Sequence, residues 1–96
     1  MHESELEDDC IKIAESLGWV TRKMQYIGRR GCRDRDFYKD GVAVFVEFKA
    51  PGEKPRPDQR IERKLLSGVG IKIHVIDNED DFRRLLSESA IKTPSR

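Results

Sequence analysis

The stretch Val42-Ala43-Val44-Phe45-Val46-Glu47-Phe48-Lys49-Ala50-Pro51-Gly52 decides the fold of this chain. Its first five residues are apolar and mostly β-branched or aromatic, which is typical of a strand buried on both faces. Glu47 and Lys49 follow two residues apart, so they share one face of the sheet. Ala50-Pro51-Gly52 then ends the strand, because proline cannot donate a ladder hydrogen bond. We therefore expect a central strand over 42–49 with an acid and a lysine at its carboxyl end.

A hairpin precedes this strand. Lys39-Asp40-Gly41 is predicted to be its turn, since Asp-Gly is a strong signal for a tight hairpin loop, and Arg33 to Tyr38 could be a short partner strand. Asp34 lies seven residues before Gly41, and Glu47 lies six after it. In an antiparallel pair the two positions come close to facing each other. The sequence thus predicts two carboxylates and a lysine at one end of the sheet.

Helical periodicity and turn signals organise the rest of the chain. Ser4 and Glu7 have the spacing of a capping box at the start of a first helix. The other expected elements are a strand over 19–27, a helix from Pro57 to Ser67, a strand over 71–76 and a last helix capped by Asp77 or Asn78. Three apolar residues of the second helix should face inward: Ile61, Leu65 and Leu66. The order α-β-β-β-α-β-α predicts an α/β fold, with a mixed β-sheet flanked by helices.

Size and composition favour one small domain over 1–96, with a frayed tail at about 91–96. No apolar run approaches the length of a membrane span, and the acidic N-terminus has no apolar core of a signal peptide. We therefore expect a cytoplasmic protein with no membrane partner. Cys10 and Cys32 should remain free thiols in that compartment, and their spacing from the two histidines is unlike that of a zinc site.

The net charge of +1 hides an uneven distribution. Residues 20–72 carry fourteen Lys or Arg against seven Asp or Glu, whereas residues 1–19 carry one Lys against six acids. A basic middle between acidic ends suits a protein that meets phosphate with one face. A solvated surface of mixed charge would have the same composition, and charge alone does not separate the two interpretations.

The two carboxylates and the lysine point to metal chemistry. Adjacent carboxylates repel, and a divalent cation removes that repulsion. Mg²⁺ takes hard oxygen ligands, usually one or two carboxylates with water and phosphate, and the backbone carbonyl of Phe48 could supply a further oxygen. Glu-x-Lys at a strand end is often only a surface ion pair. The buried run before Glu47 and the break after Lys49 favour a site over that alternative.

These residues also resemble a known family. Gly31-Cys32-Arg33-Asp34, the run from Val44 to Gly52, and Pro57-Asp58-Gln59 are similar to the VRR-Nuc family of the PD-(D/E)XK nuclease superfamily, which includes small stand-alone phage proteins. The resemblance implies a restriction-endonuclease-like core. It covers about Glu3 to about Leu86 and is most specific from Val44 to Gln59. One departure is Arg33, where the family usually has proline before its Asp.

The resemblance implies roles for particular residues. The catalytic and metal-binding Asp and Glu fall on Asp34 and Glu47, and the catalytic lysine falls on Lys49. A catalytic glutamine falls on Gln59, and a glutamate that completes the metal site falls best on Glu7, ahead of Glu5 or Glu3. Glu7 could instead serve only the helix cap, and Gln59 could be an ordinary exposed helix residue. Eight basic residues flank this set and would contact DNA: Arg22, Lys23, Arg29, Arg30, Arg33, Lys54, Arg56 and Arg60.

The expected activity is that of a Mg²⁺- or Mn²⁺-dependent DNA endonuclease. The family's small members suggest a homodimer acting on branched DNA such as Holliday junctions, and Tyr26, Ile27 and Val69 are candidate interface residues because they have no obvious core role. A non-catalytic DNA-binding module with a degenerate site is the alternative from another class, and a toxin-like or RNA-directed nuclease would use the same chemistry. The intact Asp34, Glu47 and Lys49 argue against the first of these.

Overall fold

Four strands form one mixed sheet in the computed structural model, which describes residues 2–91. The elements are α1 (Glu3–Ser16), β1 (Val20–Lys23), β2 (Arg35–Lys39), β3 (Val42–Phe48), α2 (Pro57–Ser67), β4 (Ile73–Ile76) and α3 (Glu79–Ile91). The strands lie in sequence order; β1, β2 and β3 are antiparallel, and β4 runs parallel to β3. The predicted order of elements and the mixed sheet are therefore confirmed.

The β2–β3 hairpin has the predicted turn and register. Asp40 and Gly41 both adopt positive φ, 50° and 80°, as a tight two-residue hairpin turn requires. Arg35 pairs with Val46, and the backbone N–H of Asp34 donates to the carbonyl of Val46 at 3.0 Å. Continuing this register by one residue places Asp34 across from Glu47, as the count from the turn predicts.

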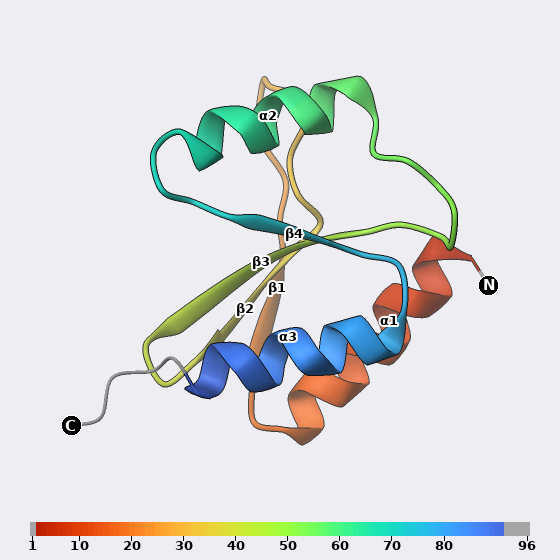
Figure 1. Cartoon of the computed structure of the whole chain (residues 1–96), viewed down its shortest axis with the longest axis vertical. Coiled ribbons are helices and arrows are strands. Elements are labelled where there is room, and N and C mark those ends of the chain that lie inside the picture. The colour runs from red at the N-terminus through yellow and green to blue at the C-terminus, as the bar shows by residue number, and fades with distance from the viewer. Residues whose placement is uncertain (1, 92–96) are drawn as a thin grey trace.

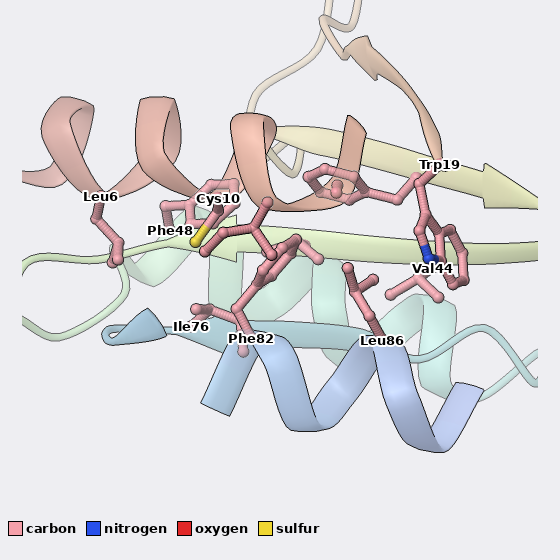
Figure 2. Packing of buried hydrophobic residues seen from close by; sticks show 12 residues of the cluster. Leu6, Cys10, Trp19, Val44, Phe48, Ile76, Phe82 and Leu86 are labelled. Atoms are coloured by element: carbon pink, nitrogen blue, oxygen red, sulfur yellow. The ribbon is translucent and has the colours of Figure 1, made fainter. Parts of the chain in front are cut away.

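The helices lie on both faces of the sheet (Figure 1), with α1 and α3 on one face and α2 on the other. Figure 2 shows the apolar core between α1, α3 and the sheet, to which Cys10, Phe48 and Phe82 contribute. The rings of Phe37, Phe48 and Phe82 contact one another, the closest pair having centroids 5.1 Å apart. This side of the sheet supplies most of the buried apolar surface and hence most of the hydrophobic stabilisation.

The pleat of β3 separates an apolar face from a polar one. Val44, Val46 and Phe48 belong to the core beneath α1 and α3. Because side chains alternate along a strand, Phe45 and Glu47 point to the other face, towards α2. The side of the sheet under α2 is thus built around buried polar groups.

The helix α2 corrects the predicted inward stripe. Ile61 and Leu65 are 62% and 56% exposed and Leu66 is half-buried, whereas Gln59 and Glu62 are buried. The physical reason is that polar partners lie on the inner side of α2: Tyr26 and Arg29, between β1 and β2, bind Glu62, and Glu47 of β3 faces Arg63. Helical periodicity identified the apolar side of α2, but at Ile61 and Leu65 that side faces solvent and not, as predicted, the sheet.

Three smaller expectations need correction. The capping-box prediction at Ser4 is wrong, since α1 begins at Glu3 with His2 at the N-cap and no side-chain cap. The first strand covers only Val20–Lys23, and β4 begins at Ile73. The predicted frayed tail falls on 92–96, outside the described residues, apart from Ile91, which ends α3.

Cys10 and Cys32 are both free, and burial raises the pKa of the Cys10 thiol to about 12. Cys10 is thus an inert packing residue of the core. In the described part of the chain, no helix has both the length and the apolar character needed to cross a bilayer.

Candidate active site

Asp34 is held in one orientation by the neighbouring strand. Its Oδ2 accepts a hydrogen bond from the backbone N–H of Phe48 at 2.6 Å, and its own backbone joins the ladder on both sides through Met24 and Val46. Burial raises the pKa of Asp34 above its ordinary value; the bond from Phe48 opposes this shift, and the negative charge of Glu7 adds to it. The carboxyl is therefore fixed in position, and a positively charged partner would stabilise its ionised form.

Glu47 is the most unusual group in the described structure. Its side chain is fully buried, and neither carboxylate oxygen accepts a hydrogen bond. The guanidinium of Arg63, on α2, lies 3.8 Å from Oε2, beyond hydrogen-bond distance. Burial raises the pKa of Glu47; Arg63 lowers it and the charge of Asp34 raises it again. A buried carboxylate without hydrogen bonds is costly, so this arrangement favours a bound cation.

Lys49 completes the predicted trio. Its residue is 4% exposed, and its backbone N–H donates to the carbonyl of Ile76 at 2.9 Å, which extends the β3–β4 pairing past the end of the strand. Electrostatic effects of Lys49 lower the pKa of both Asp34 and Glu47. The structure therefore brings Asp34, Glu47 and Lys49 together at one end of the sheet.

A divalent ion with hard oxygen ligands fits this donor set. Asp34 and Glu47 supply carboxylate oxygens, and the two oxygens of Glu47 have no other hydrogen-bond partner. Among residues 2–91, no three His, Cys, Asp or Glu side chains gather in a way that could hold a metal ion. The protein would thus provide two carboxylates and leave other positions to backbone, water or phosphate, as is usual for Mg²⁺.

Glu7 lies near this centre but is engaged elsewhere. Its carboxylate accepts from Arg35 at 2.6 Å and pairs with Lys23 at 3.2 Å. The capping role is excluded because α1 has no side-chain cap, and the role of Glu7 as a metal ligand stays a prediction. The pKa of Glu3 is also affected by the charges of the site. It is raised by burial, by a hydrogen bond with Glu53 and by the charge of Asp34, and it is lowered by Lys49.

Gln59 is 1% exposed, so the alternative of an exposed helix residue is wrong. Its Oε1 accepts from the backbone N–H of Arg56 at 3.3 Å, which links it to the start of α2. Arg56 belongs to the connection between β3 and α2, directly after the trio. Gln59 is thus a buried amide on the α2 side of the sheet, the side to which Glu47 points.

The predicted DNA contacts divide into paired and unpaired residues. Five of the eight are held in ion pairs: Lys23 with Glu7, Arg29 with Glu62, Arg30 and Arg56 with Asp58, and Arg33 with Asp36. Arg33 is the most firmly engaged, since it makes two hydrogen bonds to Asp36 and stacks 4.7 Å from the ring centroid of Phe45. Arginine in place of the family's proline thus anchors the chain beside Asp34.

Arg63 was not among the site residues expected from the sequence. Its Nη1 is buried without a hydrogen-bond partner beside Glu47. A usable signal was present in the sequence: Arg63 lies four residues after Gln59 and therefore on the same side of the helix. Assigning Ile61 and Leu65 to the inner face concealed that relation.

Two known proteins are similar to this chain over most of its length. No family model matches the chain. The chain is 36% identical over 81 residues to a protein named "Putative nuclease p44" from Acyrthosiphon pisum secondary endosymbiont phage 1, which spans 83% of this chain and 87% of that protein. A solved structure described as a VRR_NUC domain superimposes with a TM-score of 0.79 at 29% identity, covering 88% of this chain and 94% of that one. Together with the Asp34, Glu47 and Lys49 geometry, these similarities show that the chain is a nuclease of the VRR-Nuc family.

Proposed function

We propose that this nuclease is a Mg²⁺- or Mn²⁺-dependent DNA endonuclease, with Asp34, Glu47 and the carbonyl of Phe48 as its metal ligands. The observation that carries the proposal is the Glu47 carboxylate, which is buried without a hydrogen bond and whose pKa is raised by that burial although Arg63 lies 3.8 Å away. A divalent ion bound there would polarise the scissile phosphate and offset the charge that develops on it.

The chain's own residues have distinct tasks in this scheme. The N–H of Phe48 fixes the Asp34 carboxyl, so that ligand does not need to be ordered at the moment of reaction. Lys49 brings a positive charge into a buried site and can hold the attacking water and the phosphate oxygen close together. Gln59, on α2, would assist catalysis from the side to which Glu47 points. Glu7, on α1, would assist by holding Arg35 and Lys23 near the site.

We expect the preferred substrate to be branched DNA such as a four-way junction. The similarity to small stand-alone VRR-Nuc proteins supports this preference. Recognition would then rest on the shape and backbone of DNA.

Cleavage of a panel of labelled DNA structures tests the activity and the substrate together. In Mg²⁺ or Mn²⁺ the protein should cut a four-way junction at least about tenfold faster than a linear duplex, a difference of roughly 1.4 kcal/mol. Ca²⁺ should support binding with little cleavage, because its coordination is larger and looser. Full activity in excess EDTA would exclude the metal mechanism. Equal rates on junction and duplex would exclude the junction preference alone.

The exposed side of α2 supports a homodimer. Ile61 and Leu65 lie one turn apart on α2, and Val69 follows it, 75% exposed. A small chain gains stability by covering such a stripe with a second copy. Of the earlier interface candidates, Ile27 is fully exposed and remains suitable, whereas the hydroxyl of Tyr26 donates to Glu62 at 2.6 Å within the chain.

Light scattering at micromolar concentration tests the dimer. We expect a mass of about twice the 11.1 kDa of one chain, falling to one chain in I61K/L65K. Val20→Lys, at an equally accessible apolar residue of β1, is the matched control and should leave the dimer intact. A wild-type monomer that stays monomeric on DNA would contradict the dimer and leave the nuclease activity in place.

A further inference from the structure

A basic cleft opens where the second half of α2 turns back into β4. Its volume is about 740 Å³, and four of its lining residues are cationic: Arg60, Arg63, Lys64 and Lys72. The other lining residues are Ser67, Gly70, Ile71 and Ile73, so no acid faces the cleft. A concave surface with one sign of charge concentrates oppositely charged ligands.

The cations of the cleft differ from most other basic residues near the site. Within residues 2–91, the side chains of Arg60, Lys64 and Lys72 make no hydrogen bond or ion pair. Lys23, Arg29, Arg30, Arg33 and Arg56 are neutralised by neighbouring carboxylates, as described above. Charges that are already paired contribute little to binding a polyanion, because the pair must first be broken. The cleft thus gathers three cations that form no ion pair within the described chain, next to Arg63.

Arg63 connects this cleft to the catalytic centre. It lines the cleft and at the same time lies 3.8 Å from Oε2 of Glu47. Its Nη1 has no hydrogen-bond partner although it is buried, so this donor remains available to an incoming oxygen. An anion lying in the cleft would thus extend directly towards Glu47.

The dimensions favour an extended polyanion over a single phosphate. From Arg60 to Ser67 the helix advances about 10 Å at 1.5 Å per residue. One strand of DNA advances about 3.4 Å per phosphate along the duplex axis, which gives room for roughly three consecutive phosphates. Lys72, from the segment that leads into β4, faces the same space from another element.

We infer that the cleft formed by Arg60, Arg63, Lys64 and Lys72 binds the phosphate backbone of the DNA strand that enters the active site. The inference rests on the proposed DNA nuclease function and adds to it the surface along which the strand lies. Three of these residues, Arg63, Lys64 and Lys72, were absent from the interface expected from sequence. The cleft also explains why internal ion pairing of the other basic residues is compatible with DNA binding.

The test compares R60Q/K64Q/K72Q with K12Q/K39Q/R83Q, which removes three positive charges that lie outside the cleft and, within residues 2–91, form no ion pair. Arg63 is left unchanged because it contacts Glu47. Fluorescence anisotropy with labelled duplex and junction DNA, in Ca²⁺ to prevent cleavage, gives affinities over a range of salt concentrations. Thermal melting shows that both variants are folded.

The cleft variant should lose at least about tenfold in affinity at low salt. The slope of log K against log salt should become shallower by about 2 to 3, since each lost phosphate contact removes about 0.7 to 0.9. The control variant should keep the wild-type slope. A folded cleft variant with the wild-type slope and affinity would overturn the inference, as would a change of slope seen with RNA but not with DNA.

The outcomes also separate this inference from the proposed function. If the wild-type protein cuts DNA in Mg²⁺ but the cleft variant binds DNA normally, the cleft assignment fails and the nuclease function stands. If the cleft variant loses binding as expected but the wild-type protein cuts no DNA in any metal, the cleft stands and the proposed activity fails.

Discussion

Glu47→Gln is expected to reduce DNA cleavage by about a thousandfold or more while the protein remains folded. The neutral amide removes a metal ligand, and the loss of several kcal/mol of transition-state stabilisation corresponds to a rate effect of this size. DNA binding should survive, because the cations of the α2 cleft are untouched. Cleavage rates and anisotropy on the same junction DNA measure the two effects.

Glu47→Gln should maintain or raise the stability of the protein while it lowers the activity. In wild-type protein without metal, the Glu47 carboxylate is buried without hydrogen bonds, and Asp34 disfavours its charge. Glutamine has the same shape without the charge, so in EDTA the melting temperature of Glu47→Gln should equal or exceed that of wild type. Added Mg²⁺ should stabilise wild type by mass action and have little effect on the variant.

Glu62→Gln is the matched control, since Glu62 is another buried glutamate on the α2 side of the sheet. Its carboxylate accepts from Tyr26 and Arg29, and these bonds hold its pKa below the ordinary value. The change should therefore lower the melting temperature and leave cleavage nearly unchanged at low temperature. A folded Glu47→Gln protein that cuts at the wild-type rate would show that the catalytic assignment is wrong.

Gly31→Ala is expected to be the most destabilising small substitution in the loop that leads to Asp34. Gly31 has a φ of +89°, and an added Cβ would lie 2.6 Å from the carbonyl oxygen of Asp58 on α2. The left-handed conformation costs about 1–2 kcal/mol, and the clash with backbone atoms adds about 1–3 kcal/mol. The total is a large share of the ~5–15 kcal/mol that stabilises a typical domain.

Gly28→Ala separates the two contributions. Gly28 has a similar φ of +73°, but nothing lies within 4 Å of the added Cβ. It should lose only the conformational part, so Gly31→Ala should melt at least about 5 °C below Gly28→Ala. Calorimetry of both variants measures the difference. Equal melting temperatures would show that the close contact between the loop and α2 is unimportant for stability.

The hairpin and the proximity of Asp34, Glu47 and Lys49 could be predicted because local signals determine them. Asp40-Gly41 allows one tight turn, and that turn sets the register that places Asp34 opposite Glu47. The apolar run before Glu47 identified the buried strand without any knowledge of its neighbours. These relations depend on residues close in sequence, for which pattern arguments are strongest.

The surroundings of the trio could not be predicted because they depend on distant charges. Helical periodicity assigned Ile61 and Leu65 to the inner face, yet Glu62 lies there, bound by Tyr26 and Arg29 from the connection between β1 and β2. Which basic residues remain free likewise depends on carboxylates brought near by folding. Arg33, for example, is bonded to Asp36, and its role as a DNA contact stays a prediction.

The central claim is that Asp34 and Glu47 form the metal site of the nuclease. A crystal of the protein grown with Mn²⁺ tests it most directly, through the anomalous scattering of the metal. We predict a strong peak within coordination distance of both carboxylates and of the Phe48 carbonyl, and no such peak in Glu47→Gln. A peak confined to other acidic residues, or no peak beside Asp34 and Glu47 at saturating Mn²⁺, would contradict the account.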